Sequence, residues 1–258
     1  MNKVLKTALT TGAFLLIVVL GLIIWKSNRA SRAQQTCAGL NVTYKESYAF
    51  VTQSDIENYL ATDYGAYIGQ RLDSLNLDKI EKILDSKSAV LKSEAFITPD
   101  GMLNVRISQR APVVRFQKGK FGFYADERGF IFPLQSNYTS KVPIIDGAIP
   151  LDISSGYKGE PKTDDEKEWL RKAISLVEYI SSSKTWSGNI SQINVDEGGD
   201  IILVPSAGRE KFILGEPDDI NDKFERIGKY YTTIRPAKGE NTYKSVNVKY
   251  DGQIVCRK

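Results

Sequence analysis

The 258-residue chain contains no histidine. Histidine is the commonest general base near neutral pH and a leading zinc ligand, so its absence excludes Ser-His-Asp and Cys-His catalytic arrangements and the usual zinc sites. The chain also has neither a P-loop nor the glycine motif of dinucleotide-binding folds. We therefore expect no catalytic residue, no metal, no cofactor and no small-molecule substrate.

Cysteine is scarce, with only Cys37 and Cys256 in the whole sequence. Two cysteines in a chain of this length do not reveal the redox compartment. If the body consists of two domains in a row, the two cysteines belong to its opposite ends. We therefore expect them to remain unbridged.

Outside its N-terminal 33 residues, the chain has no excess of basic charge. The formal charge is +4, but five basic residues lie within the first 33 positions, and removing them leaves −1 for the remainder. A nucleic-acid surface needs clustered Lys and Arg side chains. The sequence therefore predicts no nucleic-acid binding.

The most prominent feature that is present is an apolar run, Thr7–Trp25, without a charged residue. It is long enough to cross a bilayer as a helix. A cleaved signal peptide is the alternative, but its apolar region is shorter, and the small-residue pattern Ser31-Arg32-Ala33 lies well beyond the apolar end. The basic charges on the two sides of the apolar run nearly balance. The expected orientation therefore depends on the short segment before the run, residues 1–6, which we call the stub. We predict an uncleaved type II anchor with the body outside the cytoplasm.

The first part of the body predicts a small α+β domain. A capping box, Ser54-x-x-Glu57, predicts the start of one helix, and Pro99-Asp100-Gly101 predicts a hairpin turn. The order is β-α-α-β-β, with helices on one face of the sheet. The expected elements are a strand over 40–44, helices over 54–62 and 77–84, and strands over 89–98 and 102–109.

The second part predicts a larger mixed α/β domain with an extended antiparallel sheet. A capping box, Thr163-x-x-Glu166, opens the clearest amphipathic helix, and Pro217 is placed to begin another that runs to about Thr233. Asp251-Gly252 is a strong hairpin signal near the end of the chain. The expected strands cover 121–125, 130–134, 142–145, 190–195, 201–205, 211–214, 244–250 and 253–258.

Three stretches resemble the FtsQ/DivIB family of bacterial cell-division proteins: Met102–Val113, Phe123–Phe132 and Val246–Val255. Gln109 stands where the family often has Glu, and the stub is shorter than is usual there. The family order implies a stub over 1–6, a transmembrane helix over 7–25, a junction over 26–36, a POTRA-like domain over 37–111 and a β domain over 112–258.

The resemblance implies a non-catalytic scaffold of the divisome, located at the septum in the bacterial inner membrane. In the family, late strands of the β domain bind the single-pass proteins FtsB and FtsL by strand addition, and the POTRA domain guides septal localisation and contacts other division proteins. Core packing is the alternative role for Val246, Val248 and Tyr250. The candidate partner-binding residues are Val246, Val248, Tyr250, Ile254 and Val255.

Two other functions fit some of the sequence. A POTRA-bearing envelope chaperone or transport adaptor is one, although such proteins usually carry a membrane barrel or tandem POTRA domains. A serine envelope enzyme is the other, because Ser181-x-x-Lys184 precedes Ser187-Gly188-Asn189. Such a serine must open a buried helix, whereas Ser181 closes one and no Lys-Thr-Gly strand follows. A polar helix terminus explains the pattern better.

Overall fold

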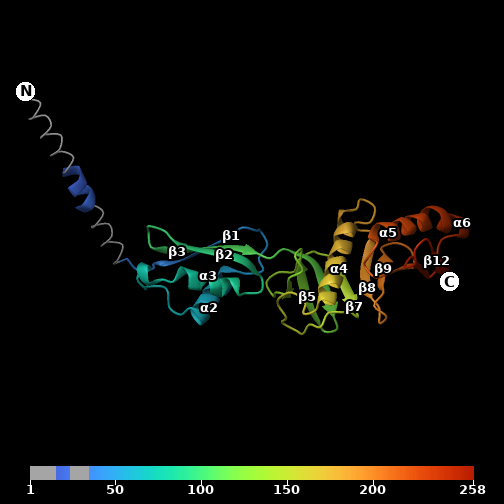
Figure 1. Ribbon diagram of the computed structural model, residues 1–258, viewed down its shortest axis with the longest axis horizontal. Coiled ribbons are helices and arrows are strands. Elements are labelled where there is room, and N and C mark those ends of the chain that lie inside the picture. Colours follow the sequence, from blue (N-terminus) through green and yellow to red (C-terminus); the bar gives the residue numbers. More distant parts are fainter. Residues whose placement is uncertain (1–15, 24–34) are drawn as a thin grey trace, which may run out of the picture. The chain divides into compact units, whose positions relative to one another are not determined.

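The computed structural model describes residues 16–23 and 35–258, and residues 16–23 are helical (Figure 1). Most of the expected anchor over 7–25, the stub and most of the junction lie outside the described residues. Within the described ranges, no helix is both long and apolar enough for a membrane span. The chain divides into two compact units, Met1–Gln109 and Arg110–Lys258, and each is considered by itself.

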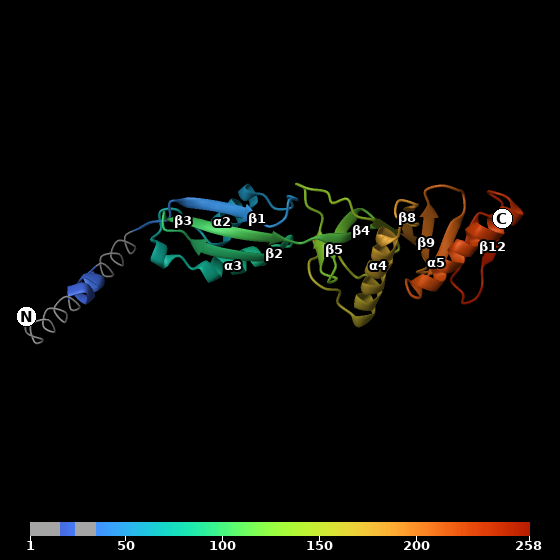
Figure 2. The ribbon, with the colours of Figure 1, turned by 90° about the horizontal axis from the view of Figure 1, so that it is seen from above.

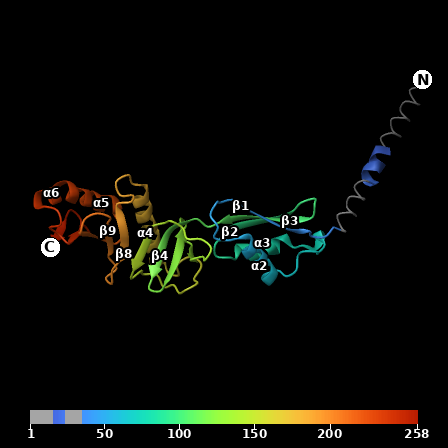
Figure 3. The same cartoon turned by 180° about the vertical axis from the view of Figure 1, so that it is seen from behind.

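The first unit is a three-stranded sheet covered on one face by two helices (Figures 1 and 3). The sheet order is β1-β3-β2, with β1 parallel and β2 antiparallel to β3. The predicted order β-α-α-β-β is confirmed. The elements are β1 (Gly39–Tyr44), α2 (Gln53–Asp63), the short η1 (Leu72–Ser74), α3 (Leu77–Asp85), β2 (Val90–Ile97) and β3 (Met102–Gln109).

The N-cap of helix α2 lies two residues earlier than expected, at Thr52 instead of Ser54. Thr52 is the N-cap, because its hydroxyl accepts from the Asp55 N–H while the Asp55 carboxylate accepts from the Thr52 N–H at 2.8 Å. The predicted Ser54-x-x-Glu57 box is therefore wrong. Thr52 has the extended backbone that an N-cap requires, whereas Ser54 is already helical.

The core of this unit forms between the helices and the sheet. Apolar side chains recur at helical spacing in α2 and α3 and on alternate positions of β3, so each element presents one face to the others. Gln109 ends the unit with a buried side chain that accepts from the Val51 N–H at 2.9 Å and donates to the Tyr48 carbonyl at 2.6 Å. The fully buried apolar residues include Ile56, Leu60, Ile80, Leu84, Leu103, Val105 and Ile107.

The second unit contains a nine-stranded sheet with the order β12-β11-β10-β9-β8-β7-β4-β5-β6. Its strands are β4 (Pro112–Lys118), β5 (Phe121–Asp126), β6 (Ile131–Pro133), β7 (Ile144–Gly147), β8 (Ile190–Val195), β9 (Ile201–Pro205), β10 (Lys211–Gly215), β11 (Ser245–Asn247) and β12 (Val255–Arg257). Its helices are α4 (Asp164–Ser182), α5 (Ile220–Lys229), the short π-helix η2 (Tyr230–Ile234) and α6 (Arg235–Lys238).

This sheet is mixed, which corrects the expected antiparallel arrangement. Three neighbouring pairs are parallel, namely β4–β7, β7–β8 and β10–β11. Parallel neighbours require a crossover connection, and α4 provides it between β7 and β8 while the α5–α6 segment provides it between β10 and β11. Strand β4 was not predicted as a strand, since it begins at Pro112, where the sequence indicates only the handover between domains.

The helices of the second unit share one core with the sheet. The predicted capping box of α4 is confirmed, because Glu166 accepts from the Thr163 N–H at 3.0 Å and Thr163 accepts from the Glu166 N–H at 3.2 Å. Tyr179 of α4 meets Phe224 of α5 with ring centroids 4.9 Å apart. Helix α5 starts at Ile220, so Pro217 lies before it rather than within its first turn.

Candidate partner-binding edge

The nine-stranded sheet ends at β6 on one side and at β12 on the other, and the β6 edge is covered. Ile131 donates its N–H to the Gly159 carbonyl at 2.8 Å, and Gly159 donates back to Ile131 at 2.9 Å. Pro133, at the end of β6, has no N–H to offer. Another strand therefore cannot pair along β6 without displacing this bridge.

The β12 edge is different, because β11 is the only strand of the described chain that pairs with β12. Val248 donates its N–H to the Ile213 carbonyl of β10 at 3.0 Å. Since backbone groups alternate in direction along a strand, Asn247 then points toward β12 and pairs with Val255. The same alternation directs the N–H and C=O of Cys256 away from the sheet.

The predicted partner-binding residues divide into two sets. Val246 and Val248 are completely buried in the core. Tyr250 is 53% exposed and Val255 is 38% exposed, while Ile254 is half-buried against the rim of the core. The hairpin therefore presents three of the five side chains to its surroundings.

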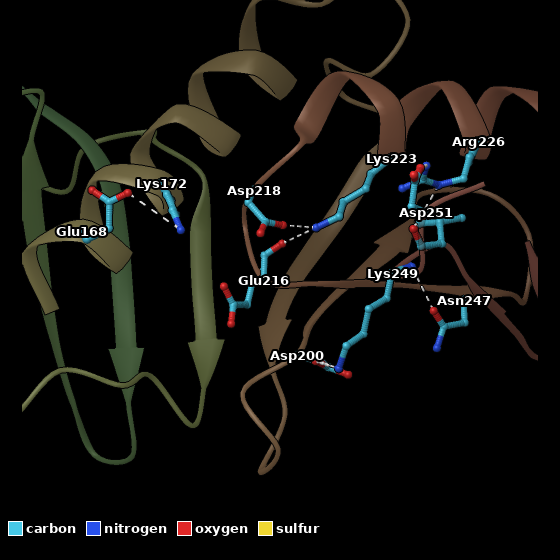
Figure 4. Close-up of polar contacts among 11 residues, drawn as sticks. Glu168, Lys172, Asp200, Glu216, Asp218, Lys223, Arg226, Asn247, Lys249 and Asp251 are labelled. Carbon is cyan, nitrogen blue, oxygen red and sulfur yellow. Dashed lines mark hydrogen bonds and ion pairs between the residues drawn. The ribbon is translucent and has the colours of Figure 1, made fainter. Parts of the chain in front are cut away.

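A buried arginine on α5 supports the hairpin (Figure 4). Arg226 donates from Nε to the Val248 carbonyl at 3.1 Å, and its Nη1 lies 3.4 Å from Asp251 Oδ1. Its side chain is only about a tenth exposed, so this bond satisfies a carbonyl in a poorly hydrated position. Arg226 fixes the point where β11 ends and the turn begins.

Lys249 makes a second attachment on the opposite side of the same segment (Figure 4). Its Nζ lies 2.7 Å from Asp200 Oδ1 in the β8–β9 turn, and its N–H donates to Asn247 Oδ1 at 2.9 Å. The hydrogen bond to Asp200 raises the pKa of Lys249. Gly215 makes room for this side chain, since a Cβ there would lie 2.7 Å from Lys249 Cγ.

The β10–α5 connection is held by another lysine (Figure 4). Lys223 is almost fully buried, donates to the Glu216 carbonyl at 2.9 Å and pairs with Asp218. Burial has the largest single effect and would raise the pKa of the Asp218 carboxyl, but the hydrogen bond and charge of Lys223, with smaller contributions from a backbone bond and Lys172, together lower that pKa. Helix α5 is therefore anchored at its start by Lys223 and carries Arg226 one turn later.

Two features of this edge were missed at the sequence level. The outward backbone of Cys256 follows from the strand pairing, which the sequence does not fix. Arg226 carried a usable signal, because it lies between Lys223 and Ile227 on the face of α5 that also bears Tyr230. Charged residues at core positions of an amphipathic helix indicate buried partners.

The serine pattern considered above lies at a helix end. Ser181 lies in the last turn of α4, and both Ser181 and Lys184 are exposed. In the described part of the chain, no group of three or more His, Cys, Asp or Glu side chains is placed to hold a metal ion. Cys37 and Cys256 are both free thiols.

Comparison with known families adds the context for this edge. A family model described as "FtsQ/DivIB, C-terminal related" matches residues 111–257, more than half of the chain. The chain belongs to the FtsQ/DivIB family. A POTRA-like domain model matches residues 35–108 of this FtsQ/DivIB protein. A search of curated proteins finds no match. Membership suggests a scaffold in cell division, and the FtsQ/DivIB family is generally non-catalytic.

Proposed function

We propose that this FtsQ/DivIB-family protein is a non-catalytic scaffold of the bacterial divisome. Residues 7–25 anchor it in the inner membrane, with the body outside the cytoplasm at the division site. It binds single-pass FtsB/FtsL-like proteins by strand addition and links them to the septal cell-wall machinery. The observation that carries this proposal is the contrast between the covered β6 edge and the uncovered β12 edge of one sheet.

Strand addition at β12 assigns different tasks to the residues of the hairpin. The outward N–H and C=O of Cys256 pair with the backbone of the partner, which supplies affinity that does not depend on sequence. Tyr250 and Val255 contact partner side chains, with Ile254 at the rim, and these contacts supply specificity. Val246 and Val248 hold the hairpin on the core and keep its edge in place.

One position separates backbone pairing from side-chain contact. Cys256→Pro removes the outward N–H and leaves the pairs of β11 with Val255 and Arg257 in place, because proline is tolerated on an edge strand when its N–H side faces solvent. Cys256→Ala removes the same thiol and keeps the N–H. Affinity for the co-purified FtsB/FtsL-like pair of the same bacterium should fall about tenfold in the proline variant, the equivalent of one lost hydrogen bond.

The alanine variant is the control and should bind as the wild type does. Hydrogen exchange in β10 and β11 reports whether each variant keeps the native hairpin. Undiminished binding by a folded Cys256→Pro protein is incompatible with strand addition at this edge. Loss of binding in both variants would assign the contact to the thiol instead.

The division role has a separate test in growing cells. A fluorescent fusion of the full chain should concentrate at midcell, and its depletion should block septation. A diffuse envelope distribution would favour the alternative, an envelope chaperone or transport adaptor.

Tyr250→Ala should weaken partner binding about tenfold with little change in stability, because an exposed tyrosine at an interface contributes mainly on binding.

A further inference from the structure

The sheet of the first unit also has two edges, and its β2 edge is closed by the protein's own side chains. Ser93 donates its N–H to Asp85 Oδ1 at 2.7 Å, and Ala95 donates its N–H to Glu81 Oε1 at 2.7 Å. Both carboxylates come from α3, which lies beside β2 (Figure 2). A register shift near Val90 further disturbs this edge. An incoming strand would have to displace two charge-assisted hydrogen bonds.

In the described part of the chain, the cover on the β1 edge stops before the strand begins: Cys37 donates its N–H to the Gln70 carbonyl at 2.8 Å and accepts from the Gly69 N–H at 2.8 Å. Lys45, just after β1, donates its N–H to the Ile107 carbonyl of β3 at 3.0 Å. By alternation, the N–H and C=O groups of Leu40, Val42 and Tyr44 point away from the sheet. Among residues 35–258, no strand other than β3 pairs with β1, which lies at the outer side of the sheet in Figure 2.

A groove of about 610 Å³ lies on the helix side of the sheet at the Leu40 end of this edge, and Leu40 is the one β1 residue among its lining residues. The side chains of Leu40, Val42 and Tyr44 face the helices and are only half-buried, whereas Asn41 and Thr43 are exposed on the other face. Alternate residues of an added strand would therefore enter the groove. Its lining includes Leu40, Glu57, Asn58, Ala61, Tyr67 and Ile68, of which Ile68 is 60% exposed.

The charge of the groove comes from a single carboxylate, Glu57, which also accepts a hydrogen bond from Gln53 Nε2 at 2.9 Å. Glu57 is the one ionisable carboxylate among its lining residues, and no Lys or Arg lines it. Burial raises the pKa of the Tyr67 hydroxyl, and the charge of Glu57 adds to that effect. Burial, with the charges of Asp55 and Glu57, raises the pKa of Tyr44 to about 12. A partner segment that suits this groove carries apolar side chains and positive charge.

We propose that the β1 edge and its groove dock an extended segment of another polypeptide, with alternate apolar side chains in the groove and a Lys or Arg beside Glu57. This second docking surface lies in the POTRA-like unit and is independent of the proposed function of β12. The inference stands on the outward backbone of β1, the adjoining groove and the charge of Glu57. The closed β2 edge excludes the other side of the sheet.

A peptide with blocked ends in which valine, lysine and valine alternate with serine is a suitable probe for the full chain in detergent micelles, because its valines and its lysine share one face. Hydrogen exchange should slow at the amides of Leu40, Val42 and Tyr44, because these three donors become paired. The readout is local, so binding of the probe at β12 does not obscure it. A probe with N-methylated amides on its pairing side should give no protection in β1.

Charge variants provide the matched comparison. Glu57→Lys should weaken protection of β1 by the valine–lysine peptide about tenfold, as expected for losing a charge-assisted contact. Glu94→Lys makes the same change on the closed β2 strand, where Glu94 is exposed, and should leave protection unchanged. Absent protection in wild-type β1, or protection that survives both Glu57→Lys and N-methylation, overturns the proposal.

Discussion

The two sheets of this protein manage their edges in different ways. In the POTRA-like unit, Glu81 and Asp85 of α3 bond the outward amides of β2. In the larger unit, a backbone bridge to Gly159 and the proline at position 133 cover β6. Among the residues that the structure describes, no further strand pairs with β1 of the first sheet or with the outer side of β12 in the second.

The difference concerns how readily each closed edge opens. A backbone bridge on a loop and a proline respond little to pH, whereas a carboxylate cap depends on ionisation. Burial alone would raise the pKa of Asp85, but hydrogen bonds from Lys92 and Ser93 outweigh burial and lower it. The comparison teaches that this protein closes one edge with side chains of a neighbouring helix and the other with the backbone of a loop.

The largest expected effect concerns the support of the open β12 edge. Arg226→Ala leaves the Val248 carbonyl without its partner, so the free energy of unfolding should fall by about 2–3 kcal/mol. Denaturant unfolding measures this change, and hydrogen exchange should quicken in β11 and β12. Lys229→Ala is the control, because its pair with Glu225 is exposed and should contribute at most about 0.5 kcal/mol. Equal effects of the two variants would refute the role of Arg226.

A medium effect is expected when the closed edge of the POTRA-like unit is uncovered. Combining Glu81→Ala with Asp85→Ala removes both caps and should cost about 1–2 kcal/mol. The variant should also associate with itself more strongly than the wild type does, because it has an additional free edge. Sedimentation over a range of concentrations measures this. Glu94→Ala is the control on the capped strand β2 and should behave like the wild type. If the mass of the double variant in sedimentation is unchanged, the capping role of Glu81 and Asp85 is refuted.

The smallest effect is the pH dependence of the same cap. Because the folded-state pKa of Asp85 is below its ordinary 3.8, the carboxylate stabilises the fold above that pH and loses this contribution as the pH falls through the folded-state value. The difference in unfolding free energy between wild type and Asp85→Ala should therefore be greatest near neutral pH and shrink below 3.8. A difference that grows on acidification would have the wrong sign.

Local chemistry explains what could be predicted from the sequence. Thr163 and Glu166 define a helix start within four residues, and Asp251-Gly252 and Pro99-Asp100-Gly101 define turns by backbone preference alone. These signals predicted the start of α4, the turn between β2 and β3, and the terminal hairpin. The cap of α2 was misplaced because Thr52-x-x-Asp55 and Ser54-x-x-Glu57 overlap, and backbone geometry decides between them.

Long-range pairing explains what could not be predicted. The parallel partners of β7 depend on how α4 crosses the sheet, and the cap on β2 depends on α3 lying beside it. At the candidate site, simple alternation from Val246 to Tyr250 implied one continuous strand. Strand β11 ends at Asn247, and Arg226 holds the next carbonyl, so Val248 is buried while Tyr250 is exposed.

The position of Cys256 gives the unmodified chain a built-in reporter. Cys37, the only other cysteine in the sequence, is 1% exposed, whereas the Cys256 thiol is half-buried on the uncovered strand. Burial raises the pKa of the Cys256 thiol, so alkylation should be slow and should accelerate in alkaline solution as thiolate forms. The rate at which a maleimide modifies this protein therefore measures how often the Cys256 thiol on β12 is exposed, without any engineered label.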